Sequence, residues 1–438
     1  MKYLQSIQEA YNAPLQLENL YQSARQANEF EEFKADIITN YNTSQDNVLY
    51  VAWYYRLQSV EAEPQKKVER SPNWWLAILL GIITGLTLWA LSGPGLIFID
   101  QIPYVVLLGA PITTLFALIF LTLTAKKNYR RGILVGLGLL ISCLYIMVMA
   151  SLQPDYYCKY YLELMAVQLV LLSWIAIGIT VMGLRSGAEN RFAFLIKSFE
   201  VMITAGLYLI AGMILGMITL GMFGALSITL PDELLRLMVA GGIGLISVVA
   251  IASVYDPTVS PESQDFNLGL SKFIFTMMRL LLPLTLAILV IYVLVIPFNF
   301  MEPFTNRDIL IVYNVMLFAI MGLLIGVTPI KVDGLSSKIQ VLLRNGILAV
   351  SVLAVLVSLY ALSAVIYRTV QGGITINRLA IIGWNSINIA LLVLLIFKQF
   401  KSGMTGWVDR LHSVFSLGAA VYLVWAVFLM LAIPILFR

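Results

Sequence analysis

Long apolar segments alternate with short polar ones along most of this chain, beginning at Trp74. Eleven of them are long enough to cross a bilayer as helices, which takes about 20 residues at a rise of about 1.5 Å per residue. They lie at residues 74–92, 104–124, 132–152, 162–184, 200–224, 234–254, 272–298, 309–327, 343–367, 379–397 and 412–436. The pattern predicts an all-α, polytopic transmembrane helical bundle with the lipid bilayer as its surroundings.

The first 60 residues follow a different pattern, with apolar side chains at helical spacing among many polar ones. Leu17 and Tyr21 share one helix face, and the same spacing returns in residues 30–41 and 48–55. Three short helices are predicted, and they resemble tetratricopeptide-like hairpins. They are interpreted either as a module that docks a cytosolic protein or as a small cap packed on the membrane domain. The predicted domains are a helical cytoplasmic domain at 1–60, a charged linker at 61–73 and a transmembrane domain at 74–438.

The number of lysine and arginine residues alternates between high and low from one loop to the next, so that one side of the predicted bundle is much more basic than the other. The basic side carries Lys66, Lys67, Arg70, Lys126, Lys127, Arg130, Arg131, Arg185, Arg191, Lys197, Lys272, Lys331, Lys338, Arg344, Lys398, Lys401 and Arg410. The other side carries Lys159, Arg236, Arg307, Arg368, Arg378 and Arg438. Because basic loops stay in the cytoplasm, the N-terminus is predicted to be cytoplasmic and the C-terminus extracytoplasmic. The first residues contain no apolar core of a signal peptide, so no cleavable signal is expected.

Residues 185–200 are too polar for a membrane span. Phe192, Leu195, Ile196 and Phe199 nevertheless form one apolar stripe. This arrangement predicts a short separate helix that lies in the membrane interface on the cytoplasmic side.

The composition supports a membrane protein and narrows its chemistry. Hydrophobic residues make up 60% of the chain and charged residues 12%, against about 45–50% and about 25% in soluble domains. The net charge of +4 is spread over loops, so no nucleic-acid partner is expected. With one histidine, His412, and two cysteines, Cys143 and Cys158, we expect no metal site, no cofactor and no disulfide framework.

Glycines recur at four-residue spacing in several segments, which lets helix backbones approach closely in lipid. The pairs are Gly81 and Gly85, Gly132 and Gly136, Gly212 and Gly216, and Gly322 and Gly326. They are interpreted as packing positions inside the bundle or as contact faces of a homo-oligomer.

The seventh segment contains an arginine, Arg279, one turn before Pro283, which is expected to kink the helix. Either Arg279 extends its charged end toward the cytoplasmic interface, or it forms an intramembrane ion pair with Asp256.

The densest polar cluster lies where the ninth and tenth segments meet in an extracytoplasmic turn at Gly372 and Gly373. The candidate site residues there are Tyr360, Tyr367, Arg368, Arg378, Asn385 and Asn388. One interpretation is a binding site for an anionic group, namely a lipid head group, a lipid-linked sugar or a small anion. The other is a structural latch, in which the two arginines bond backbone carbonyls and Glu302 or Asp308.

The run Tyr367-Arg368, Gly373, Thr375 and Asn377-Arg378 resembles the signature of an uncharacterised bacterial family of polytopic membrane proteins, domain of unknown function 4153. The resemblance covers the last third of the chain, and Ile376 stands where that family more often has proline. It implies a location in the bacterial inner (plasma) membrane, and it implies no activity.

Three functions remain open at this point. A transporter or channel for a small or anionic solute or a lipid fits the number of spans, the glycine-rich helices and the proline, although Glu163, Glu200 and Asp256 all lie at span ends. A structural or regulatory subunit would hold a cytosolic partner on the N-terminal helices. A membrane enzyme acting on a lipid-linked substrate would need a base at the interface, and no recognisable catalytic set accompanies the available carboxylates.

Overall fold

The computed structural model describes residues 3–26, 29–43, 46–62, 73–225, 228–266, 269–330, 335–404 and 406–437. Within these ranges the chain is helical almost throughout. The chain divides into two compact units, residues 1–71 and 72–438. Most of the predicted charged linker, residues 63–72, lies outside the described ranges.

The first unit consists of four short helices around its own apolar core. The three predicted segments are helices, and a further short helix precedes them. The helices are α1 (Leu4–Glu9), α2 (Pro14–Gln26), α3 (Phe30–Thr43) and α4 (Val48–Ala62). Asn47 begins α4 because its Oδ1 accepts the backbone N–H of Leu49 at 2.8 Å, which satisfies an otherwise free donor of the first turn. Leu17, Phe33 and Trp53 pack in the centre of the unit.

Among its described residues, the second unit contains eleven helices that are long and apolar enough to cross a membrane, which confirms the predicted number of spans. They are α5 (Trp74–Leu91), α6 (Tyr104–Ala125), α7 (Tyr129–Ser151), α8 (Asp155–Met182), α9 (Ala188–Ala225), α10 with α11 (Asp232–Arg236 and Gly242–Val254), α12 (Gly269–Val295), α14 (Arg307–Val327), α15 (Ser337–Gly372), α16 (Ile376–Ser402) and α17 (Trp407–Leu436). The short helix α13 (Glu302–Thr305) precedes α14, and a π-helical turn, Leu237–Gly241, joins α10 to α11.

Short connections alternate between the two ends of this bundle. We call the end with loops 126–128, 183–187, 255–266 and 403–406 the basic face, and the other end the opposite face. The opposite face carries the turn 373–375 and the small hairpin of β1 (Ile97–Phe98) and β2 (Ile102–Pro103).

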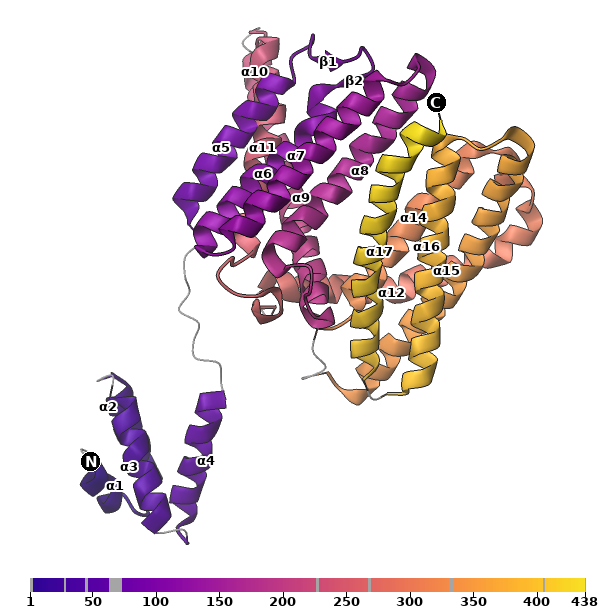
Figure 1. Ribbon diagram of the computed structural model, residues 1–438. Helices are drawn as coiled ribbons and strands as arrows, with labels where there is room; N and C mark the ends of the chain where they lie inside the picture. Colours follow the sequence, from indigo (N-terminus) through magenta and orange to yellow (C-terminus); the bar gives the residue numbers. More distant parts are fainter. Residues whose placement is uncertain are drawn as a thin grey trace. The chain divides into compact units, whose positions relative to one another are not determined.

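The long helices form two groups that are visible side by side in Figure 1. One group holds α5 to α8 and α11, and the other holds α12 and α14 to α17. A large apolar core lies inside the second group, where Leu324, Val350 and Leu392 are buried. Residues near the start of α9, including Phe192, belong to that core, while the second half of α9 packs on α11. Helix α9 therefore joins the two groups.

The predicted separate interfacial helix at residues 185–200 is wrong, because residues 188–200 are the first part of the 38-residue helix α9. The apolar stripe is present, but its side chains face protein. Phe192 stacks on His412 of α17 with ring centroids 4.0 Å apart, and Ser416 donates a 2.7 Å hydrogen bond to the Ala188 carbonyl. The apolar stripe thus packs against protein, while Arg185 and Glu189 at the start of the segment are exposed.

Several of the paired glycines lie at close helix contacts within the chain. A Cβ added at Gly85 would lie 2.5 Å from the carbonyl oxygen of Gly241, and one at Gly244 would lie 2.6 Å from Cα of Gly85. A Cβ at Gly132 would lie 2.8 Å from Thr122 of α6, and one at Gly326 would lie 3.0 Å from Met278 of α12. Close backbone packing between helices therefore accounts for these positions.

Candidate functional site

A cavity of about 1530 Å³ is lined by residues of α8, α9, α14, α16 and α17. Along α8 its lining extends from Tyr156 to Val181. At about 1.5 Å per residue this is about 37 Å, more than the ~30 Å hydrocarbon thickness of a bilayer. The cavity therefore extends along nearly the full length of α8, from one face of the bundle toward the other.

The rim of this cavity is apolar and exposed inside the helical spans, at mid-helix in α8, in the first half of α9 and one turn into α14. Val167 of α8 is 66% exposed, Met202 of α9 is 61% exposed and Ile311 of α14 is 48% exposed, and all three line the cavity. Large apolar side chains at these depths face hydrocarbon in a membrane. The cavity is thus open sideways toward the region that lipid tails occupy.

Toward the opposite face, the lining becomes polar. Arg368, near the end of α15, and Thr375, Asn377 and Arg378, at the start of α16, all line this part of the cavity. The sequence singled out Arg368 and Arg378, and the structure brings both to one end of the same cavity. We call this part the arginine end.

The two arginines at this end differ in their hydrogen bonds. Arg378 donates from Nη1 to the carbonyl of Gly373 at 2.6 Å, and its backbone N–H donates to the capping hydroxyl of Thr375 at 3.3 Å. Gly373 has a φ of 74°, a conformation that favours glycine, so this carbonyl is fixed by the turn. Arg368 Nη1 is buried and has no hydrogen-bond partner among the described residues. The latch interpretation thus fits Arg378, while Arg368 has bonding capacity left for a ligand.

The middle of the cavity carries isolated amides among apolar walls. Gln168 is 1% exposed, and its Oε1 has no partner within the described chain. Asn314 uses its Nδ2 to donate to the Leu310 carbonyl one turn earlier, at 2.8 Å. Trp384 and Tyr422 supply aromatic walls, and their rings lie 5.1 Å apart.

Asn385 and Asn388, which the sequence grouped with the arginines, do not line the cavity. Both are buried in the bundle. The Asn388 Oδ1 accepts a hydrogen bond from the Tyr422 hydroxyl, so Asn388 acts on the cavity only by holding one of its walls.

Tyr360 and Tyr367 also lie outside the cavity lining. The Tyr360 hydroxyl donates to the carbonyl of Phe300 at 2.7 Å, and the ring of Tyr367 packs edge-on against Phe304 at 5.5 Å. The tyrosines therefore hold the segment that precedes α14. No ion pair of either arginine with Glu302 is present, and the side chain of Asp308 lies outside the described residues.

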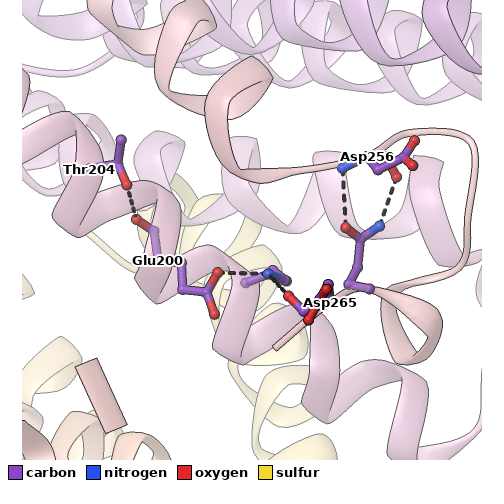
Figure 2. A network of polar contacts seen from close by, with 6 residues as sticks. Glu200, Thr204, Asp256 and Asp265 are labelled. Atoms are coloured by element: carbon purple, nitrogen blue, oxygen red, sulfur yellow. Dashed lines mark hydrogen bonds and ion pairs between the residues drawn. The ribbon is translucent and has the colours of Figure 1, made fainter. Parts of the chain in front are cut away.

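Toward the basic face, a buried ion pair lies beside the cavity (Figure 2). The Lys197 ammonium is 2.7 Å from Oε2 of Glu200, and it also donates to the backbone carbonyl of Asp265 at 2.7 Å. The ring of Phe266 lies 4.7 Å from the Lys197 nitrogen. Lys197 lines the cavity, but the carboxylate next to it neutralises its charge.

The same network fixes the loop of residues 255–266 on α9 (Figure 2). The side-chain amide of Gln264 accepts the backbone N–H of Asp256 at 3.1 Å and donates to its carbonyl at 2.7 Å. Asn190 accepts the backbone N–H of Glu262 at 3.1 Å. Loop 255–266 and the first third of α9 are thus bonded at several points.

The proposed ion pair of Arg279 with Asp256 is not formed in the structure. Asp256 Oδ1 accepts both the backbone N–H and the hydroxyl of Thr258, at 2.8 and 2.7 Å, and Arg279 Nε has no partner among the described residues. The Asp256 carboxylate instead stabilises the turn in which it lies, through its bonds to Thr258.

Sequence reasoning did not identify Lys197 and Glu200 as a pair. Their spacing of three residues on one helix was the available signal, because opposite charges at that spacing are neighbours. Among the described residues, no group of three His, Cys, Asp or Glu side chains is placed to hold a metal.

The helices and the lipid-facing cavity together define the chain as a multi-pass, all-α membrane protein. Comparisons found no match to a protein-family model, a curated protein or a solved structure. The resemblance to the uncharacterised bacterial family stays a prediction.

Proposed function

We propose that this protein is a transporter-like protein that takes an apolar or amphipathic solute into the cavity and moves it between the two faces of the membrane. The cavity carries this proposal, because it follows nearly all of α8 and opens sideways to lipid. A solute with a hydrocarbon part enters such a space without crossing a charged barrier at the sides. The polar groups at the two ends would then meet the solute near each membrane surface.

A lipid-movement assay tests this function. The full chain is reconstituted into vesicles that contain a lipid with a fluorescent tail, and dithionite is added outside to destroy the label in the outer leaflet. Movement between leaflets raises the destroyed fraction above the half found in protein-free vesicles.

A cavity-filling variant with a matched control makes the assay specific. Ala419 of α17 lines the cavity, whereas its neighbour Ala420 is exposed and does not. Ala419→Trp should slow the movement at least about tenfold, because the indole occupies the path, and Ala420→Trp should leave it unchanged. Equal rates in both variants, or no movement by the unmodified protein, would refute the proposal.

The arrangement in the membrane is part of the proposal. We place the basic face in the cytoplasm of a bacterial inner membrane, which puts the N-terminal unit inside and the arginine end outside. Lys126, Lys127 and Arg131 at the basic face support this order. A periplasm-active reporter fused after the last residue should be active, and a cytoplasm-active one inactive.

A second candidate function is that of a subunit of a membrane complex. The observation that favours it is the separate core of the N-terminal unit, together with exposed Leu15 and Val48 on its surface. Purification of the protein from native membranes tests this function. A partner that copurifies in fixed stoichiometry with the full chain, and is lost when residues 1–60 are deleted, would support it.

A further inference from the structure

We propose that the ligand of this cavity is an anionic amphiphile, with its acidic head group at Arg368 and Arg378 and its hydrocarbon chain along the apolar walls. This inference rests on the proposed function and names the class of solute. It also fixes the orientation of the bound molecule, because its head group and its tail are placed at different depths in the membrane.

The distribution of charge in the cavity supports an anion. Three basic side chains line it, namely Lys197, Arg368 and Arg378, and no Asp or Glu is among the described lining residues. Lys197 is neutralised by Glu200 at 2.7 Å. Neither arginine has a carboxylate within ion-pair distance among the described residues. The uncompensated positive charge of the cavity is therefore concentrated at the arginine end.

The hydrogen bonds of that end suit a phosphate or carboxylate head group. A guanidinium presents several N–H donors in one plane and binds such groups with two parallel bonds. Turn 373–375 fixes Arg378 through its bond to the Gly373 carbonyl, while Arg368 Nη1 is buried without a partner in the described chain. Thr375 and Asn377 add neutral polar groups beside them.

Size and shape point to an amphiphile instead of a small soluble anion. Sites for small molecules usually enclose about 300–1,000 Å³, whereas this cavity has about 1530 Å³. Most of its wall is apolar, with Val170, Phe318 and Trp384 among the lining side chains. A phosphate ion alone would leave this wall in contact with water, but an acyl chain would cover it.

The lateral opening provides the route for the tail. Val167, Met202 and Ile311 are exposed lining residues inside three different helices, at mid-helix in α8, in the first half of α9 and one turn into α14. A lipid can therefore keep its chain in hydrocarbon while its head group reaches the arginines.

Lipid binding to the full-length protein tests the inference. Detergent-solubilised protein is titrated with phosphatidylglycerol, phosphatidylcholine or glycerol 3-phosphate, and bound ligand is counted by native mass spectrometry. We expect phosphatidylglycerol to bind at least about tenfold more tightly than phosphatidylcholine, and glycerol 3-phosphate not to bind. The variant Arg368→Ala with Arg378→Ala should lose that preference, because charge-assisted hydrogen bonds to the head group are gone.

Two controls keep the result interpretable. Lys159→Ala removes one positive charge from an exposed residue of α8 that does not line the cavity, and it should retain the preference. Should the alanine pair fail to fold, Arg368→Gln alone keeps the tethered Arg378, and it should still weaken phosphatidylglycerol binding.

Each adverse outcome has a distinct meaning. Equal binding of both phospholipids, unaffected by the arginine variants, would overturn the head-group site while lipid movement in vesicles could persist. Competition by glycerol 3-phosphate as strong as that by phosphatidylglycerol would overturn the amphiphile and leave a site for a soluble anion. Selective phosphatidylglycerol binding without any lipid movement would instead contradict the transport function and preserve the site.

Discussion

The ammonium of Lys197 lies 2.7 Å from Oε2 of Glu200, and both side chains are only 3% exposed. Two opposite charges one helical turn apart thus share a site that water does not reach. Separating such a pair is costly, because the remaining charge stays buried without compensation.

We therefore predict that Glu200→Leu and Lys197→Met each destabilise the protein by about 3–5 kcal/mol. The double variant should recover most of this loss, because it removes both buried charges and leaves apolar side chains of similar volume. Thermal unfolding in detergent measures the effect. If the stability lost in the double variant equals the sum of the losses in the two single variants, the two charges do not stabilise the fold as a pair.

The close approach of α5 to the π-helical turn before α11 gives a second prediction. A methyl group at Gly85 would lie 2.5 Å from a backbone oxygen of Gly241, and backbone cannot move aside as a side chain can. Gly85→Ala should lower stability by about 1–3 kcal/mol, the usual range for overpacking. Gly138→Ala on α7 is the matched control, since a Cβ there meets no atom within 4 Å. Similar melting temperatures for the two variants would contradict this contact.

The cysteines provide a third prediction. Cys143 of α7 and Cys158 of α8 are unpaired and buried. In the folded protein neither thiol should react with a membrane-impermeant maleimide, and both should react after denaturation. Mass spectrometry of the labelled protein counts the modified sites. Rapid labelling of either thiol under native conditions would show that its helix is not packed as described.

A pH-dependent contact in the N-terminal unit gives the fourth prediction. Arg56 donates from both terminal nitrogens to Glu18, and this lowers the pKa of the Glu18 carboxyl from its ordinary value of 4.5. A carboxyl with a lowered pKa stabilises the fold above the ordinary value, and the stabilisation is lost as the pH falls through the folded-state pKa. Because the pair is partly exposed, the contribution should be only about 0.2–1 kcal/mol.

Hydrogen–deuterium exchange in the full chain measures this contact. Peptides from α2 and α4 of Glu18→Gln should exchange faster than those of the unmodified protein at pH 7. Once the pH has fallen below the folded-state pKa of Glu18, the two proteins should exchange alike, because the protonated carboxyl, like the glutamine amide, carries no charge. A difference that persists at acidic pH would assign the effect to something other than charge.

The hydrophobic pattern predicted the helices well because the backbone N–H and C=O groups of each span must form hydrogen bonds within the span when lipid surrounds it. The boundaries near Trp74, Tyr104 and Val327 agree with the sequence closely. The interfacial helix predicted at residues 185–200 was wrong because polarity alone does not show whether a segment faces water or other parts of the chain. Here the covering contacts join residues far apart in sequence, such as Lys197 and the backbone carbonyl of Asp265.

The candidate site was predictable only in part. Arg368 and Arg378 violated the charge pattern of the loops, and both lie at one cavity end. Tyr360 and Asn388 shared their segment but bond to Phe300 and Tyr422 instead. Helical spacing gives the face of one helix, whereas the neighbour of that face is set by tertiary packing, which no single segment encodes.

Helix α9 has mechanical properties that follow from how unevenly it is held. Its first third is bonded to α17 and to loop 255–266, and no residue after Thr204 is buried. The helix has 38 residues and is about 57 Å long, and its second half packs on α11, where the Tyr208 and Ser253 hydroxyls form a 3.0 Å hydrogen bond. Because α9 is attached to both groups of helices, a displacement of one group against the other has to bend or shift α9, whose exposed Met202 borders the cavity.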